Sequence, residues 1–202
     1  MNKENVKYLN EEQMEAIHDK FREIYPDHDQ VIYLHEKESE YVHSDLGFMW
    51  SSGDKDLIII YTMGMSASKN SNIELFIKVP KNMMLKELSC SICDNKSSNI
   101  IDCIDPKYLF LIKDMIKLTK LPEMTGEVYS DGHTIMMDRD NPYYYGFREV
   151  FNGDIYDKSI SFCYLVPLTV ENFIEISSIN PKKNWEKRLS YLDSQMVVYN
   201  LN

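Results

Sequence analysis

The chain has 202 residues, of which 44% are hydrophobic, and its 32 acidic and 22 basic residues give a formal net charge of −10. A polypeptide of this length and composition can bury a sizeable core, which indicates a globular protein of one domain or at most two small ones. The strong acidity argues against unaided binding to nucleic acid, because phosphates require a basic surface. It favours a basic partner, or serves solubility alone.

The sequence carries no signal for a membrane or for secretion. No apolar run approaches the roughly 20 residues that cross a bilayer, and the stretch MNKENVKYLNEE lacks the apolar core of a signal peptide. We therefore expect a cytoplasmic protein without a membrane partner. Cys90 and Cys93 form a CxxC motif, but no second CxxC or CxxH completes a tetrahedral metal site, so we expect free cysteines.

The first predicted element is an amphipathic helix over residues 10–25. Asn10 can cap its N-terminus and Gln13 can return the hydrogen bond, as in a capping box. Apolar residues recur at helical spacing on one face, and Pro26 ends the pattern. A short strand is expected at 31–35.

Three strands are predicted next, at 41–50, 57–62 and 73–79. The run LIIIY that opens the second strand is continuously apolar, which is typical of a strand buried on both faces. In the third strand every second residue is aliphatic, and Pro80, which has no N–H, ends the pairing. The short polar loops between these strands favour an antiparallel meander.

The second half of the chain opens, after a stretch without a clear pattern, with a predicted helix. Asp105 can cap it and Pro106 suits its first position. Apolar positions recur at helical spacing until Pro122, which is expected to end the helix. A strand is then predicted over 127–137.

Two further strands, 147–151 and 160–166, are predicted with a connecting loop at 152–154, where the sequence reads Asn-Gly-Asp. Thr169 can cap a short helix that runs to about Ser177.

A last amphipathic helix, beginning at Asn180-Pro181 and running to about 193, completes the pattern. Strands in the centre, with helices at the ends and in one crossover, indicate an α+β fold with a central mixed, mostly antiparallel sheet flanked by helices. No internal repeat and no long linker divides the sequence, so we expect a single domain over 1–202.

Five short motifs occur in an order that resembles the suppressor of fused (SUFU-like) domain family, especially its bacterial single-domain members. They are YVHSD at 41–45, YTMGMS at 61–66, IELFIKVP at 73–80, GHTI at 132–135 and ISFCYLVPLTVENF at 160–173. The resemblance covers roughly residues 35–176. The chain departs from the family pattern at Asn172, where a second acid is usual, and at Met84, in a region where the family often carries Trp.

The resemblance implies a mixed α/β domain that binds other proteins. Similar domains in animals sequester a transcription factor by holding a peptide as an added strand. Similar bacterial domains serve as immunity proteins encoded beside polymorphic toxins, many of which act on nucleic acids. Because the chain lacks the second half of the animal proteins, we carry over the bacterial role as an expectation.

An active site could be built from Ser66 as nucleophile, His133 as base and Asp45 as orienting acid. However, the sequence GMSAS around Ser66 is not the G-x-S-x-G nucleophile elbow, and the strand–turn–helix context of that motif is missing. We therefore expect these three side chains to hydrogen-bond the backbone and to fix the shape of loops.

A metal site is a further alternative, with His35, His43, Asp45 and His133 as ligands. His43 and Asp45 are two residues apart, so on a strand they point to the same face. Without a third ligand nearby in the sequence, the pattern favours satisfied histidines. We expect no metal and no cofactor.

The tyrosine run at 143–145, with Tyr156 and Tyr164, could supply aromatic surface for an interface, or could alternate between core and solvent. The acidic stretches 36–40 and 154–157 could enter a basic cleft, or could be solvated loops. The residues that we expect to shape loops or to contact a partner are Asp45, Gly64, Met65, Ser66, Gly132, His133, Tyr143, Tyr144 and Tyr145.

The leading hypothesis is a non-enzymatic, cytoplasmic immunity protein that binds and neutralises a cognate toxin, whose toxin domain is expected to be basic. Two alternatives stay open. One is a small-molecule or metal-dependent enzyme that uses His133, Asp45 and Ser66. The other is a module that captures an extended peptide along an exposed strand edge.

Overall fold

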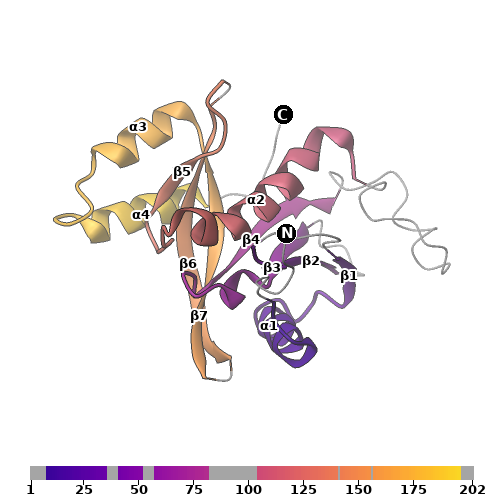
Figure 1. The fold of residues 1–202 in the computed structure, drawn as a ribbon. Coiled ribbons are helices and arrows are strands. Elements are labelled where there is room, and N and C mark those ends of the chain that lie inside the picture. Colours follow the sequence, from indigo (N-terminus) through magenta and orange to yellow (C-terminus); the bar gives the residue numbers. More distant parts are fainter. Residues whose placement is uncertain are drawn as a thin grey trace.

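A seven-stranded sheet runs through the centre of the computed structural model, which describes residues 8–35, 41–51, 57–81, 104–140, 142–155 and 157–196 (Figure 1). Its strand order is β1-β2-β3-β4-β7-β6-β5. The elements, in chain order, are α1 (Glu11–Ile24), β1 (Gln30–Leu34), β2 (Asp45–Trp50), β3 (Leu57–Met63), β4 (Ile73–Pro80), α2 (Leu109–Thr125), β5 (Thr134–Met136), β6 (Tyr144–Ile155), β7 (Lys158–Leu168), α3 (Val170–Ser178) and α4 (Trp185–Gln195).

The sheet is mixed, with a single parallel pair among the described strands. Strands β1 to β4 form an antiparallel meander, and the pairs β5–β6 and β6–β7 are also antiparallel. The two halves join where β4 pairs with β7 in parallel, with Ile73 opposite Ser161. The predicted α+β fold with a mostly antiparallel sheet is thereby confirmed.

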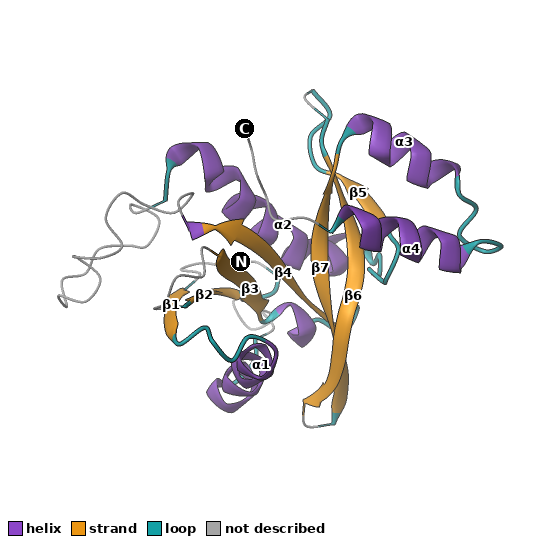
Figure 2. Cartoon of the chain, turned by 180° about the vertical axis from the view of Figure 1, so that it is seen from behind, coloured by secondary structure: helices purple, strands orange, loops and turns teal. Residues whose placement is uncertain are grey.

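Helices cover both faces of the sheet, and each face has its own hydrophobic core. One core packs against α2, and the other packs against α1, α3 and α4 (Figure 2). Along β3 the side chains alternate between them, because Ile58 and Ile60 belong to the first core and Ile59 and Tyr61 to the second. This explains why β3 is continuously apolar.

The first predicted helix is confirmed in detail. Asn10 accepts a hydrogen bond from the amide of Gln13 at 2.8 Å, and the Gln13 side chain accepts one from the amide of Asn10 at 3.1 Å. This capping box begins α1, whose Phe21 is fully buried among the rings of Tyr61, Phe76 and Phe162.

The sequence predicted that helix α2 ends at Pro122, but the helix continues beyond this residue. It continues to Thr125, and Gly126 follows in the left-handed region with φ +73°. Proline removes one backbone hydrogen bond, but Pro122 is buried, and its carbonyl accepts the Gly126 amide at 2.9 Å. Packing and a good C-terminal cap therefore offset the missing donor.

Among the described residues, no helix is both long and apolar enough for a membrane span.

The hairpin of β6 and β7 is longer than predicted, and residues 152–154 lie inside β6 rather than in a loop. Gly153 pairs with Ile160, and the turn falls after Ile155. Stacking of Phe151 on Phe162, with ring centroids 4.2 Å apart, extends the pairing. As a result, β6 and β7 form a long pair that projects beyond the rest of the sheet (Figures 1 and 2).

Three other predicted elements are shorter in the structure than the sequence indicated. The strand predicted at 41–50 begins at Asp45, the strand predicted at 127–137 is reduced to β5, and the last helix begins at Trp185 instead of Asn180. The amide of Asn184 donates to the Asn180 carbonyl at 2.9 Å, so the segment before α4 is a turn.

Candidate functional site

A buried carboxylate holds the turn between β3 and β4. The Oε1 atom of Glu74, which is fully buried, accepts from the amides of Gly64 and Ser66, at 3.1 and 2.9 Å, and from the Ser66 hydroxyl at 2.5 Å. Its Oε2 atom accepts from the Thr62 hydroxyl at 2.6 Å. Gly64 has a φ of +133°, and a Cβ there would lie 2.3 Å from the His43 carbonyl oxygen, so only glycine fits.

The surroundings of Glu74 act on its protonation in opposite directions. Burial raises the pKa of its carboxyl group above the ordinary value, and the hydrogen bonds from Ser66, Thr62 and Gly64 partly lower it. Because the side chain has no exposed surface, these bonds shape the turn and are closed to a ligand.

A lysine from β7 fixes the other side of the same turn. The ammonium group of Lys158 donates to the carbonyl oxygens of Ser66, of Ser68 at 3.1 Å and of Ser71 at 2.8 Å. Burial lowers the pKa of Lys158, and nearby Glu74 raises it in part. The lysine therefore ties residues 66–71 to the long hairpin.

Helix α2 supplies a third attachment. Glu123 accepts from the Ser68 hydroxyl at 2.6 Å and from the Lys69 amide at 3.0 Å. The side-chain amide of Asn70 donates to the Pro122 carbonyl at 3.3 Å. Buried and partly buried groups from three elements thus hold this segment in one conformation.

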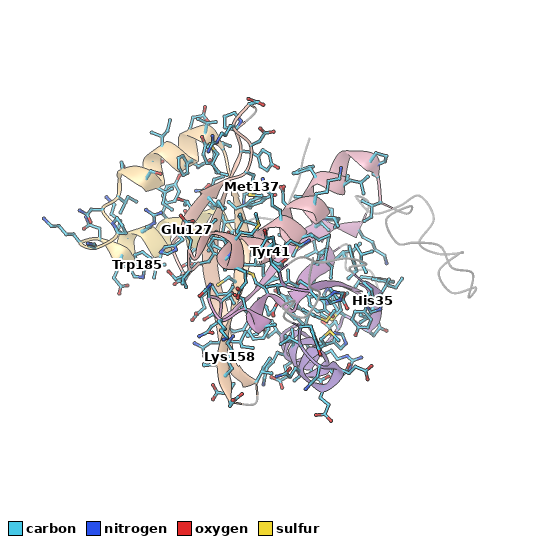
Figure 3. The ribbon with its side chains drawn as sticks, in the orientation of Figure 1. His35, Tyr41, Glu127, Met137, Lys158 and Trp185 are labelled. Atoms are coloured by element: carbon cyan, nitrogen blue, oxygen red, sulfur yellow. The ribbon has the colours of Figure 1, made fainter. Side chains whose placement is uncertain are left out.

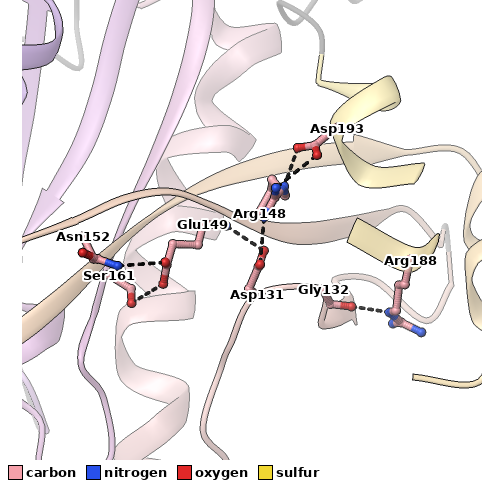
Figure 4. A network of polar contacts seen from close by, with 8 residues as sticks. All are labelled: Asp131, Gly132, Arg148, Glu149, Asn152, Ser161, Arg188 and Asp193. Carbon is pink, nitrogen blue, oxygen red and sulfur yellow. Dashed lines mark hydrogen bonds and ion pairs between the residues drawn. The ribbon is translucent and has the colours of Figure 1, made fainter. Parts of the chain in front are cut away.

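A second loop, residues 128–133, is held in the same manner. Asp131 accepts from the Arg148 guanidinium at 2.7 Å and from the Glu149 amide at 2.8 Å, and Arg148 also donates to Asp193 of α4 (Figure 4). Hydrogen bonds to Asp193 are the main reason that the pKa of Arg148 lies above its ordinary value.

Gly132 and His133 follow in this loop. The Gly132 carbonyl accepts from Arg188, its φ is +78°, and a Cβ there would lie 2.9 Å from the ring of Trp185. His133 shares a hydrogen bond with the Ser130 hydroxyl at 2.9 Å and meets Trp185 edge to face. Burial, followed by the charge of Arg188, lowers the pKa of His133.

Residues 69–73 and 128–131 of these two loops line a cavity of about 580 Å³ at the start of the parallel pair. Its lining also includes Glu149, whose carboxylate accepts from the Ser161 hydroxyl at 2.5 Å and from the Asn152 side chain at 3.2 Å (Figure 4). The described residues that line the cavity are Lys69, Asn70, Ser71, Asn72, Ile73, Val128, Tyr129, Ser130, Asp131, Glu149, Ser161 and Trp185.

Asp45 lies in a different region. Its carboxylate, 3% exposed, pairs with His35 at 2.7 Å and with His43 at 3.1 Å, and it lines a smaller cavity of about 170 Å³ beside α1. His35 and Trp185, the ring partner of His133, lie on opposite sides of the molecule (Figure 3). No group of three or more His, Cys, Asp or Glu side chains in the described part of the chain could hold a metal ion.

The predicted site residues therefore separate into distinct places. The Ser66 hydroxyl donates to the side chain of Glu74 and not to the backbone, which corrects the prediction for this residue. Asp45 pairs with two histidines, and His133 bonds to Ser130. None of the three belongs to the described lining of the larger cavity. Gly64 and Gly132 shape the loops that form its walls, and Met65 is buried in the core on the α2 side.

The tyrosine run lies mostly inside the protein. Tyr145 is 2% exposed and donates to Asp114, and the half-buried Tyr143 donates to the same carboxylate at 2.8 Å. Tyr144 faces the opposite core and stacks on Phe173 with centroids 3.9 Å apart. In this fold Tyr144 and Tyr145 are core residues, which corrects the interpretation of the run as interface surface.

Sequence reasoning missed Glu74, Lys158, Arg148 and Glu149. For Glu74 the sequence contains a signal of burial. Phe76 lies on the same side of the strand, and a large apolar residue there indicates that this second face of the sheet is covered as well as the first. For the other three no pattern in the sequence marks a role. Cys90 and Cys93, the acidic stretch 36–40 and Tyr156 lie outside the described residues.

Comparison with known proteins supports the fold. No family model matches the chain, and no curated protein matches it by sequence. Among solved structures, it is similar to a protein described as a SUFU (suppressor of fused protein) homologue from Neisseria gonorrhoeae FA 1090, with a TM-score of 0.63 over 96% of each chain and 11% sequence identity. The chain thus has a SUFU-like fold.

Proposed function

We propose that this chain is a protein-binding domain, namely a bacterial immunity protein that binds and neutralises a cognate polymorphic toxin in the cytoplasm. The observation that carries the proposal is the fold, which matches a SUFU homologue across 96% of both chains. As the resemblance of the sequence motifs implies, domains of this kind act by holding other proteins and break no bonds themselves.

The charge of the chain supports a basic partner. The exposed side of α1 carries five acidic residues, Glu11, Glu12, Glu15, Asp19 and Glu23, against Lys20 and Arg22. Together with the net charge of −10, this surface would speed encounter with a basic toxin domain. Exposed Tyr33, which borders the same side, offers an aromatic contact of the kind that anchors interfaces.

The bonding of the loop residues also supports a binding role. The Ser66 hydroxyl donates to a buried carboxylate, and the Asp45 carboxylate is 3% exposed. Both groups act as scaffold for the turns in which they lie. Such rigid loops suit a surface that recognises its partner without rearrangement.

The position of β1 favours a specific mode of binding. Strand β1 is the outermost strand at its end of the described sheet, and its Tyr33 lines a small cavity together with Glu11 and Glu15 of α1 (Figure 1). An extended segment of the partner could pair with the outer edge of this strand by backbone hydrogen bonds. This mode of binding is the peptide-capturing alternative, which we propose for the outer edge of β1.

Co-expression tests the proposal. The chain would be produced together with the toxin domain encoded beside its gene, and the purified material examined by native mass spectrometry while growth of the cells is followed. We expect a one-to-one complex and protected growth. A double variant, Glu11→Lys with Glu15→Lys, should weaken the complex more than Glu171→Lys with Glu175→Lys on α3. Separate species and continued toxicity would refute the proposal.

A further inference from the structure

The cavity between residues 69–73 and 128–131 has walls that are fixed before any ligand arrives. One wall is held by Glu74, Lys158 and Glu123, and the other by Arg148 and Arg188. A site whose walls are already ordered loses little conformational entropy when it binds. The cavity, at about 580 Å³, is within the size range of pockets that take small ligands or single side chains.

The first wall is poorly suited to an anion, because most of its backbone donors are already used. The amide of Lys69 donates to Glu123, that of Asn70 to the Ser68 hydroxyl, that of Ser71 to the Ser68 carbonyl, and that of Ile73 to the Ser71 hydroxyl. Lys69 is the single basic residue in the described lining, and its side chain is exposed.

Glu149 offers the opposite chemistry. Its carboxylate is partly buried and accepts from two neutral donors, Ser161 and Asn152, and among the described residues it has no cationic partner. A carboxylate can accept about four hydrogen bonds, so acceptor capacity remains. The neighbouring Asp131, in contrast, is already neutralised by Arg148.

Two aromatic residues complete the chemical character of the cavity. Trp185 lies in its lining, and the face of an indole ring attracts a cation. Tyr129, 7% exposed, also lines it and stacks on Phe147 with ring centroids 4.6 Å apart. Its hydroxyl oxygen has no accessible surface, so Tyr129 contributes the aromatic ring to the cavity and no polar contact.

We propose that this cavity binds a cationic ammonium or guanidinium group, with Glu149 as its counter-ion and Trp185 as its aromatic neighbour. The cation could be a free amine or the side chain of a lysine or arginine presented by another protein. The inference stands apart from the proposed toxin binding, because it concerns the cavity and needs no particular partner.

Titrations followed by NMR of the ¹⁵N-labelled chain test the proposal. The probes are agmatine as a free cation, N-acetyl-arginine amide as a protein-like side chain, N-acetyl-citrulline amide as its neutral isostere, and inorganic phosphate. The indole N–H of Trp185 reports on the cavity, and that of Trp50, the other tryptophan of the chain, serves as an internal reference. We expect saturable shifts at Trp185 with the guanidinium probes alone.

The two guanidinium probes distinguish the sources of the cation. Tighter binding of N-acetyl-arginine amide favours a side chain from a protein, and tighter binding of agmatine favours a free amine. Equal response to the citrulline probe, a response to phosphate in their place, or no saturable shift with either guanidinium would overturn the proposal.

A charge-neutral variant assigns the effect to Glu149. Glu149→Gln keeps the size of the side chain and can still bond to Ser161 and Asn152, so it should fold. We expect it to weaken guanidinium binding roughly tenfold or more. Glu175→Gln, the same change at an exposed position on α3, should leave binding unaltered. Unchanged affinity in Glu149→Gln would remove the proposed counter-ion even if the toxin complex forms normally.

Discussion

At position 64 the backbone and its neighbours leave room for hydrogen only. The φ of +133° disfavours any L side chain, and the His43 carbonyl would lie 2.3 Å from a Cβ atom. We expect Gly64→Ala to lower the free energy of unfolding by more than about 3 kcal/mol, since strain and a backbone clash add together. Urea denaturation provides the measurement.

Gly126 is a matched control for this prediction. Its φ is +73°, but a Cβ there would meet nothing within 4 Å. Gly126→Ala should therefore cost only the conformational term of about 1 kcal/mol. If both variants lost the same free energy of unfolding, the close approach of the His43 carbonyl to position 64 would make no contribution to stability.

A second residue-scale prediction concerns Glu74 and pH. Since the folded state raises the pKa of this carboxyl group, it holds the proton more tightly than the unfolded chain does. The contribution of Glu74 to stability is therefore largest below the ordinary glutamate pKa of 4.5 and is lost as the pH rises through the folded pKa. Glu74→Gln cannot ionise, so its stability relative to the natural protein should increase as the pH is raised above about 4.5.

Glu74→Ala separates ionisation from hydrogen bonding. It leaves the amides of Gly64 and Ser66 and two hydroxyl groups without their acceptor, and should cost about 3 kcal/mol or more at every pH. Thermal melts of the three proteins across the pH range decide the matter. A difference between Glu74→Gln and the natural protein that stays constant with pH would rule out a raised pKa.

Sequence reasoning predicted the role of the small residues better than that of the charged ones. Gly64 and Ser66 stand in a recognisable motif, and the structure places them in a turn that they shape. Glu74 occupies a position in an alternating strand that would face solvent if only one side of the sheet were covered. Its burial depends on helices covering the second face as well, and Phe76, on the same side of the strand, is the local sign of that cover.

Among the elements, the hairpin of β6 and β7 supports one wall of the cavity through Lys158. Lys158→Met retains the aliphatic stem but leaves the carbonyls of Ser66, Ser68 and Ser71 without the ammonium group. We expect a loss of about 1–3 kcal/mol and faster hydrogen exchange at residues 66–73. Hydrogen exchange read by mass spectrometry checks both the size and the place of the effect.

Lys113→Met is the control for the hairpin prediction, because Lys113 is exposed on α2. It should change neither stability nor exchange measurably. Hydrogen exchange in Lys158→Met could also become faster over the whole chain and not only at residues 66–73. That result would mean that the lysine supports the whole fold and not this loop in particular.

Local patterns predicted the elements where tertiary structure agrees with them. The capping box of α1 and the β2–β4 meander are confirmed because each is encoded by neighbouring residues. The signals at Pro122 and at Asn152-Gly153-Asp154 predicted breaks that do not occur. In both cases burial of adjacent side chains, in α2 and at Phe151, outweighs the local preference.

At the scale of the whole molecule, the arrangement that creates the cavity is the parallel pair of β4 and β7. It brings Ile73 opposite Ser161 across 88 positions of sequence, and it places the 69–73 segment beside the 128–131 loop. Sequence order alone predicts that adjacent strands pair, so a contact between strands this distant was not foreseeable from periodicity. The family resemblance supplied the fold, and the SUFU-like neighbour agrees with it.

The central claim is that this acidic molecule acts by binding another protein. The most direct test is the rate of association between the purified chain and the toxin domain encoded beside its gene, measured at about 10 mM and about 150 mM salt. With a net charge of −10, we predict a one-to-one complex whose association slows roughly tenfold or more at the higher salt concentration. Absence of a complex at micromolar concentrations would contradict the claim, and an association rate independent of salt would contradict its electrostatic basis.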